Sequence, residues 1–336
     1  MLDIDGSYGE GGGQILRTAL AFACLTITPC RIVNIRRGRR KPGLMPQHLA
    51  AVRAAATISG AALEGDEQGS TAVTFSPQAV RGGTFEFHIG TAGSVTLLLQ
   101  TIILPLLMAG RPSRVSLTGG THVPFSPCCH YLAEVFVPLL RRLGGELRLT
   151  IDAYGFYPRG GGRVVAEIEP CRGFRPLTLT SPGSVRRVTG MSGVGNLPLS
   201  IAERQRAAAR ETLAAACGAA LPPPRIELFD APGPGQGTFL FLKAETDAVA
   251  AGFTALGARG KRAETVGNEA AAELCAHLAT GAALDPHLAD QIVPFLALAP
   301  APSTFTTSRI TRHLLTNLWV IDLFHPLRYQ IVGEEG

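Results

Sequence analysis

The 336-residue sequence lacks any apolar stretch of about 18 residues, the minimum for a helix that spans a membrane. The nearest candidate, 95–109, is interrupted by Gln100 and Pro105 and predicts a buried helix. The first residues also lack a basic segment followed by an apolar stretch and a small-residue cleavage site, which would indicate a secretory signal. We therefore expect a cytoplasmic protein without a membrane partner.

The sequence also lacks the cysteine spacing of a disulfide framework or a zinc site. The seven cysteines are an odd number without a Cys-x-x-Cys pair, which predicts reduced thiols rather than disulfides or a structural zinc site. Cys128 and Cys129 lie between His122 and His130 and so resemble a metal cluster. Because adjacent cysteines rarely chelate one zinc ion and the usual ligand spacing is missing, buried thiols are the favoured interpretation.

Lysine is scarce. Only Lys41, Lys243 and Lys261 are lysines among 31 basic residues, so arginine, whose planar fork suits phosphate oxygens, carries nearly all the positive charge. The net charge of +5 alone says little about nucleic acid. The local clustering of six basic residues within 31–41 is more informative.

The length of the chain predicts two domains or one large domain built from repeats. A repeated order of helices and strands is visible along the sequence. The first unit has a glycine-rich turn, a helix at 14–24, a strand at 31–36, a helix at 46–59 and strands at 61–64 and 71–75. The second has a helix at 94–108, a strand at 114–117, a helix at 127–143 and strands at 146–151 and 163–168. The third starts near Asp290 with a helix at 290–298, a strand at 303–307 and a helix at 312–324.

Proline-rich breaks at 221–224 and 231–235 delay the third unit and indicate an inserted domain. We expect residues 1–179 and 280–336 to form a large repeat-built catalytic domain and 180–279 a smaller inserted α/β domain. Helices alternating with strands predict an α/β (α+β) class, with sheets packed under helices.

The loop at 9–13 is rich in glycine, so backbone N–H groups could approach an anion at the start of a helix. It is neither a Walker loop, since Gly-Lys-Ser/Thr is missing, nor a dinucleotide fingerprint, since Gln14 replaces the third glycine. Glu10 offers oxygen ligands suited to Mg²⁺. The alternative for Glu10 is a carboxylate stabilised by the helix dipole.

Basic and polar side chains follow the loop and indicate a convergent pocket, although each arginine alone could be a solvated surface charge. They are Arg17, Arg36, Arg39, Gln47 and His48.

His313 begins a predicted helix after hydroxyl and basic neighbours at 306–309. A neutral imidazole, available at pH 7 because its ordinary pKa is about 6.5, attacks phosphorus readily. A structural histidine is the alternative. The segment 287–291, His-Leu-Ala-Asp-Gln, could stack on and hydrogen-bond a purine, or could simply be a helix start capped by Asp285 or Asp290.

These residues belong to a series of motifs that resembles the RNA 3′-terminal phosphate cyclase family over nearly the full length. The motifs are Asp5-Gly6-x-x-Gly9-Glu10-Gly11-Gly12-Gly13-Gln14-Ile15-Leu16-Arg17, Arg36-x-Gly38-Arg39-x-Lys41-Pro42-Gly43-Leu44, Gln47-His48-Leu49, Ala92-Gly93-Ser94, Gly119-Gly120-Thr121, Gly155-Phe156-Tyr157-Pro158-x-Gly160-Gly161-Gly162, Leu288-Ala289-Asp290-Gln291 and His313-Leu314-Leu315-Thr316-Asn317.

The resemblance implies three βαβαββ units in the large domain, with a small α/β domain inserted before the last. It also implies a three-step reaction. His313 attacks the α-phosphorus of ATP, the AMP moves to an RNA 3′-phosphate to give an RNA(3′)pp(5′)A end, and the 2′-oxygen then expels AMP and closes a 2′,3′-cyclic phosphodiester.

The resemblance assigns roles residue by residue. Glu10 is implied as the ligand of Mg²⁺ (or Mn²⁺), and Arg17, Arg36, Arg39, Gln47 and His48 as the pocket for the triphosphate and the RNA end. The implied adenylate pocket comprises Gln100, Pro127, Phe253, His287, Leu288, Ala289, Asp290 and Gln291.

The chain departs from the family pattern in several places. His287 stands where a tyrosine would usually stack on adenine, Cys128 where a second proline often follows Pro127, and His122 and His130 where aspartates are frequent. No aromatic-rich strand or basic stripe indicates sequence-specific RNA binding, so we expect recognition of the RNA terminus.

Two other functions stay open. An enolpyruvyl transferase is built from similar repeats and would need no adenylated histidine. A non-catalytic relative that binds RNA in ribosome assembly would bind RNA without turnover, although such proteins resemble this chain less at the nucleophile.

Overall fold

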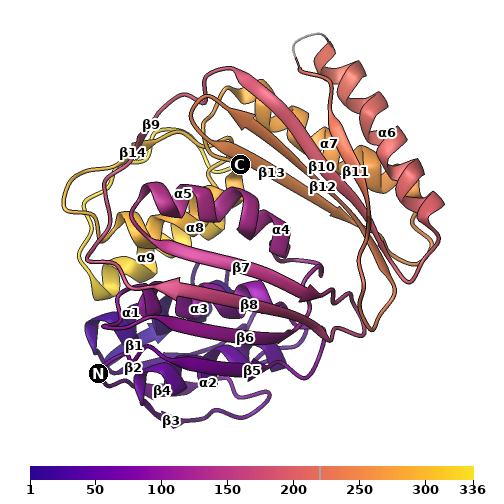
Figure 1. Ribbon diagram of the computed structural model, residues 1–336. Helices are drawn as coiled ribbons and strands as arrows, with labels where there is room; N and C mark the ends of the chain where they lie inside the picture. The colour runs from indigo at the N-terminus through magenta and orange to yellow at the C-terminus, as the bar shows by residue number, and fades with distance from the viewer. Residues whose placement is uncertain (219–220) are drawn as a thin grey trace.

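A computed structural model describes residues 1–218 and 221–336 (Figure 1). The first unit is one four-stranded sheet in the order β1-β2-β4-β3, with α1 and α2 between its strands. β1 pairs with β2 in parallel, whereas β4 runs antiparallel to both β2 and β3. The elements are β1 (Leu2–Asp5), α1 (Gly13–Thr26), β2 (Cys30–Val33), α2 (Pro46–Ser59), β3 (Ala62–Glu64) and β4 (Val73–Ser76).

The second unit repeats this topology, because its sheet has the order β5-β6-β8-β7 with the same parallel and antiparallel pairings. Its elements are β5 (Thr84–His88), α3 (Val95–Leu107), β6 (Ser113–Gly119), α4 (Cys129–Tyr131), η1 (Leu132–Phe136), α5 (Val137–Arg142), β7 (Glu146–Ala153) and β8 (Gly162–Glu169). The helical run from α4 to α5 contains the π-turn η1 just before Pro138, which has no N–H to donate to a regular helical bond.

The third unit is shorter. It consists of β9 (Thr178–Leu179), α8 (Pro286–Leu296), β14 (Thr304–Phe305) and α9 (Arg312–Phe324). β14 pairs with β9 in parallel, and the chain after α9 forms an isolated bridge between Glu335 and Ile310. α9 packs against both α1 and α8, which brings the end of the chain back to its beginning.

The segment between β9 and α8 forms a four-stranded sheet in the order β11-β10-β12-β13. Its elements are β10 (Val185–Gly195), α6 (Leu199–Cys217), β11 (Arg225–Asp230), β12 (Gly237–Thr246), β13 (Ala250–Leu256) and α7 (Ala263–Thr280). Residues of β12 alternate between two cores: Leu240 and Leu242 join the cluster under α6 and α7, whereas Phe239 and Phe241 join the main cluster with the second unit. The domain boundaries after residues 179 and 279 stay a prediction.

The mixed α/β class is confirmed, and the elements expected in the first two units form close to their predicted bounds. β2 ends at Val33 rather than at Arg36, because Asn34 and Arg36 have φ of 54° and 55°, which a strand does not accommodate. β1 and β5, the first strands of their units, were not predicted from the pattern. Within 1–218 and 221–336, no helix combines the length and the apolar character needed to cross a membrane.

Candidate active site

The glycine-rich loop before α1 lies directly against α9. Gly9 and Gly11 have φ of 55° and 61°, a left-handed conformation that favours glycine. A Cβ atom on Gly9 would lie 2.5 Å from the Oγ1 of Thr316, so the close approach also requires a missing side chain. The same Thr316 Oγ1 accepts a hydrogen bond of 3.2 Å from the backbone N–H of Glu10. α9 therefore fixes the loop in place.

Asn317 joins three helices. Its Oδ1 accepts hydrogen bonds from Thr18 Oγ1 at 2.5 Å and Gln14 Nε2 at 2.8 Å, both on α1, and its Nδ2 donates to the carbonyl of Asp290 on α8 at 2.7 Å. The side chain is buried, so each lost partner would leave a polar group unsatisfied, at a cost of about 1–3 kcal/mol. Asn317 thus holds together the elements that carry the predicted site residues.

His313 lies in the first turn of α9, which Thr311 caps by accepting a hydrogen bond of 3.1 Å from the N–H of Leu314. Its side chain is 45% exposed, and Nε2 lies 4.0 Å from Oε1 of Glu10. Partial burial, and then the positive charge of Arg17 and further basic neighbours, lowers the pKa of His313 to about 4. The ring is therefore neutral at pH 7 and keeps a lone pair for nucleophilic attack.

Glu10 has one engaged and one free carboxylate oxygen. Oε1 forms an ion pair with Arg39, while Oε2 is buried and has no hydrogen-bond partner among the described residues. A buried carboxylate oxygen without a partner is costly unless a ligand satisfies it. The donor type and this free oxygen fit a hard divalent cation such as Mg²⁺.

Arg17 and His48 meet at the first residue of α1. A Cβ atom on Gly13 would lie 2.5 Å from His48 Nε2 and 2.8 Å from Arg17 Nη1. Arg17 donates to Gln14 Oε1 at 2.7 Å, its Nε is buried without a partner in the described chain, and burial lowers its pKa to about 10. Both side chains therefore converge on the helix start, where backbone N–H groups favour an anion.

His48 is a neutral donor at this point. Burial, helped by Arg17 and Arg36, lowers its pKa to about 3. Its Nδ1 accepts a hydrogen bond of 3.3 Å from the N–H of Met45. In a neutral ring this assigns the proton to Nε2, the atom beside Gly13.

The other predicted phosphate ligands differ in accessibility. Arg39 reaches Glu10 across the loop, but Arg36 donates from Nη1 to the carbonyls of Lys41 and Gly43 and so holds its own turn. Gln47 accepts a hydrogen bond of 3.1 Å from the N–H of Ser94, the N-cap of α3. Arg17, Arg39 and His48 are thus the phosphate candidates nearest the loop, while Arg36 and Gln47 stabilise its surroundings.

Several predicted adenylate residues share one cavity with Arg17. Gln100 from α3 and Asp290 and Gln291 from α8 line it together with Asn317. Burial raises the pKa of Asp290 to about 8, and Arg17 partly opposes this rise. Gln291 Oε1 is another buried atom with no partner in the described ranges. The cavity therefore offers unsatisfied polar groups next to a cation.

The remaining predicted adenylate residues are more dispersed. His287 is exposed and follows Asp285, which caps α8 by accepting from the N–H groups of His287 and Leu288 at 2.9 Å. Leu288 and Ala289 are fully buried core residues. The carbonyl of Pro127 accepts from Thr96 at 2.7 Å. Phe253 is not brought to this cavity, because its ring packs 5.7 Å from that of His277 in the core under α7.

Sequence reasoning missed four supporting residues: Gln14, Thr18, Thr316 and Asn317. The signal was available, because Thr316 and Asn317 follow His313 by three and four residues and so share its helix face. Their partners, however, lie about 300 residues earlier in the chain.

Comparison with known proteins gives one family over nearly the whole chain. A family model described as RNA 3′-terminal phosphate cyclase matches residues 8–331. Relatives named RNA 3′-terminal phosphate cyclase include those of Methylococcus capsulatus (47% identical, covering 98% of this chain and 93% of the relative), Methanopyrus kandleri (46%, 100% and 96%) and Pyrobaculum neutrophilum (44%, 98% and 94%). Among solved structures, the enolpyruvyl transferase NikO from Streptomyces tendae matches at 20% identity and a TM-score of 0.28, over 51% of this chain and 33% of that one.

Proposed function

The chain belongs to the RNA 3′-terminal phosphate cyclase family, and we propose that it converts an RNA 3′-phosphate to a 2′,3′-cyclic phosphodiester with ATP, through a covalent adenylate on His313. The observation that carries this mechanism is the position of His313 Nε2, 4.0 Å from Glu10 Oε1. Arg39 forms an ion pair with the same Glu10, and Arg17 reaches the start of α1, so both guanidinium groups are placed to stabilise a phosphate at this loop.

In the first step the neutral ring of His313 attacks the α-phosphorus of ATP through Nε2. An N–P bond forms, the bond to pyrophosphate breaks, and the ring keeps its proton on Nδ1. Arg17 stabilises the negative charge that develops on the phosphate oxygens of ATP, and Arg39 is assigned mainly to the RNA 3′-phosphate of the second step. The glycine-rich loop and the start of α1 add backbone N–H groups, and His48 adds its Nε2–H.

In the second step an oxygen of the RNA 3′-phosphate attacks the adenylate phosphorus, the N–P bond breaks and the neutral imidazole returns. In the third step the neighbouring 2′-oxygen attacks the 3′-phosphorus, its proton passes to water, and AMP leaves. The ribose already holds the 2′-oxygen beside phosphorus, so proximity supplies much of this step. ATP is needed because a phosphate monoester alone has no good leaving group.

Glu10 is the residue that we propose to hold Mg²⁺ or Mn²⁺, through its free Oε2. The ion would neutralise charge on the triphosphate during attack. Gln100, Asp290 and Gln291 are proposed to bind the adenosine, and the exposed ring of His287 to stack on the base with less area than a tyrosine would offer. Phe253, Leu288 and Ala289 are less suited to direct contact because they are buried.

Intact-mass measurement after incubation with ATP and Mg²⁺ tests the proposal. We expect one added AMP, acid-labile and mapped to His313, and no addition to His313→Asn. An unmodified wild-type protein that still binds RNA would support the non-catalytic alternative. An adduct on another side chain would overturn the assignment of the nucleophile, and the enolpyruvyl alternative requires no adduct at all.

A further inference from the structure

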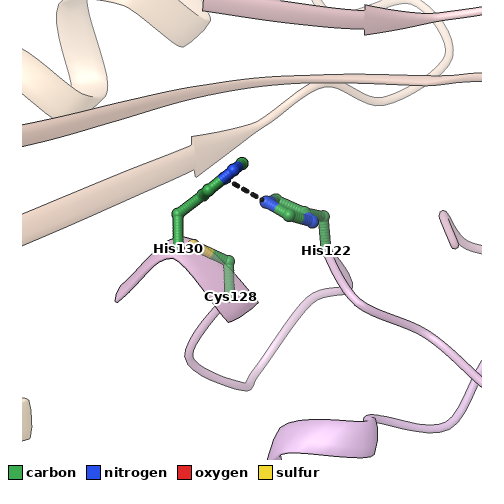
Figure 2. Close-up of side chains that lie close together, drawn as sticks. All are labelled: His122, Cys128 and His130. Atoms are coloured by element: carbon green, nitrogen blue, oxygen red, sulfur yellow. Dashed lines mark hydrogen bonds between the residues drawn. The ribbon is translucent and has the colours of Figure 1, made fainter. Parts of the chain in front are cut away.

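A second cluster of reactive side chains lies away from the loop at 9–13. The ligand atoms of His122, Cys128 and His130 all lie within 4.8 Å of one another, and the three residues are 1%, 2% and 7% exposed. Figure 2 shows the two imidazoles joined by a hydrogen bond between ring nitrogens, with Cys128 beside His130. None of these residues has a part in the reaction described above.

The fold assembles this cluster from one short connection. His122 follows β6 and forms an isolated bridge to Phe156, Cys128 is the N-cap of α4, and His130 lies within α4. Cys129 does not join the cluster, which removes the objection that two adjacent cysteines rarely chelate one ion. The sequence interpretation as buried thiols is confirmed for both Cys128 and Cys129. Linear spacing did not indicate that Cys128 lies beside the two histidines.

Both imidazoles are oriented by outer partners. His122 Nε2 and His130 Nδ1 lie 3.0 Å apart, while the outer nitrogens contact Thr121 Oγ1 at 3.0 Å and Tyr154 Oη at 3.1 Å. Metal-binding histidines are likewise oriented by a hydrogen bond at the nitrogen that does not bind the metal, and here a hydroxyl oxygen occupies that position on each ring. The rings are enclosed by aromatic side chains, of which Phe239 is nearest to His122 at 4.3 Å between centroids.

A hydrogen-bonded chain from Thr121 to Tyr154 could satisfy both rings without an ion. This series of hydrogen bonds does not involve the thiol of Cys128, however. Cys128 Sγ has only weak partners in the described residues, Thr254 Oγ1 at 3.2 Å and the N–H of Tyr131 at 3.4 Å. Imidazole nitrogen and thiolate sulfur are the ligand types that zinc prefers, and a site with three protein ligands takes a water molecule in its fourth position. Ligand atoms around zinc are about 3.3–3.8 Å apart, so small side-chain rotations would suffice.

We propose that His122, Cys128 and His130 bind one Zn²⁺ ion, with two neutral imidazoles and a thiolate as ligands. The Cys128 thiol releases its proton on binding. The ligands His122 and Cys128 bracket residues 123–127, which include Pro127 and the fully exposed Phe125 at a φ of 61°. The ion would thus fix both ends of this loop, while Phe239 of β12 packs against the rings of His122 and His130.

The test uses the full chain, freed of metal by a chelator and kept reduced, and titrated with Zn²⁺ and with Co²⁺ as a spectroscopic probe. We expect uptake of about one equivalent of Zn²⁺, a higher Tm, and a thiolate-to-cobalt absorption band from tetrahedral Co²⁺. Cys128→Ser should lose the band and bind Zn²⁺ at least roughly 100-fold more weakly, since changes outside the ligand set already cost about 10- to 100-fold.

Two variants serve as controls. Cys217→Ser removes a thiol on α6 and should keep both the band and the Zn²⁺ stoichiometry, and His313→Asn should keep them as well. Folded wild-type protein without stoichiometric uptake, or without the thiolate band, would overturn the proposal even if Cys128→Ser failed to fold. So would loss of Zn²⁺ binding in His313→Asn instead of Cys128→Ser, because it would assign the metal to the site at the chain ends.

Discussion

The molecule contains two groups of histidines that burial keeps neutral, and they differ in what surrounds them. His313 is 45% exposed, has cationic neighbours, and lies near buried polar atoms that have no protein partner in the described chain, such as Glu10 Oε2 and Arg17 Nε. His122 and His130 are enclosed by aromatic rings, and their nitrogens all have partners.

This difference separates two uses of the same side chain. Polar groups that stay unsatisfied at a partly open surface are suited to a substrate that arrives and leaves. A closed, oriented cluster is suited to a resident ion, because the exclusion of solvent and the fixed rings favour slow exchange. We call the surroundings of His313, Glu10 and Arg17 the open site, and His122, Cys128 and His130 the closed cluster. We expect changes at the open site to alter turnover, and changes at the closed cluster to alter stability and metal content.

The largest expected effect comes from His313→Asn, which removes the nucleophile and keeps the helix cap. Cyclisation of a 3′-phosphorylated RNA should fall by roughly 10⁴-fold or more, with Tm nearly unchanged. Rates from single-turnover assays and Tm from calorimetry check this. His88→Asn, on the exposed strand β5, is the matched control and should keep full activity. A large loss of stability in His313→Asn would contradict the division between the two sites.

Glu10→Ala should slow formation of the His313 adenylate by about 100-fold at limiting Mg²⁺, since it removes the proposed metal ligand. Raising Mg²⁺ should restore part of the rate. Glu10→Gln removes the negative charge but keeps the size of the side chain, so it separates the effect of charge from the effect of volume. If the adenylylation rate of Glu10→Ala were unchanged at limiting metal, Glu10 would instead serve to anchor Arg39.

Much of this open site was accessible to sequence reasoning because its chemistry is concentrated in short motifs. The loop at 9–13 and the helix of His313 were each predicted, and α9 has the expected bounds 312–324. Their contact was not predictable from periodicity, because Asn317 and Thr18 are 299 residues apart and their hydrogen bond exists only in the folded chain. The match to a family supplied that connection instead.

The closed cluster was the harder case for the opposite reason. Its residues are close in sequence, but linear spacing does not reveal that Cys128 joins the two histidines while Cys129 stays outside. Short strands were missed for a related reason. β5 alternates between half-buried Phe85 and Phe87 and exposed polar residues, but it is only five residues long, which leaves little pattern to detect.

His48 sharpens the comparison, because it is buried like the closed cluster but belongs to the open site. Its pKa in the folded chain is about 3, below the ordinary 6.5, so the unfolded chain takes up a proton first as the pH falls. The contribution of neutral, buried His48 to the free energy of unfolding is complete above pH 6.5 and is lost progressively as the pH falls toward 3. At pH 5 the loss amounts to about 2 kcal/mol of the free energy of unfolding.

His48→Gln should therefore lose less stability than the wild type between pH 7 and pH 5, by about that amount. Urea unfolding at the two pH values measures the difference, with His88→Gln as the exposed control. Equal losses in wild type and His48→Gln would mean that folded His48 takes up its proton at the ordinary pKa. The Nε2–H that we assign as a phosphate donor would then be part of a cation at pH 5.

Arg39→Ala gives the smallest expected effect, because the side chain is 45% exposed and solvent screens its charge. We expect KM for RNA with a 3′-phosphate to rise about tenfold, with a smaller change in KM for ATP. Arg37→Ala removes the same charge from an exposed position two residues earlier and should change neither constant by much. If KM for ATP alone rises in Arg39→Ala, then Arg39 binds the triphosphate, and the RNA end is held by the more deeply buried Arg17 and His48.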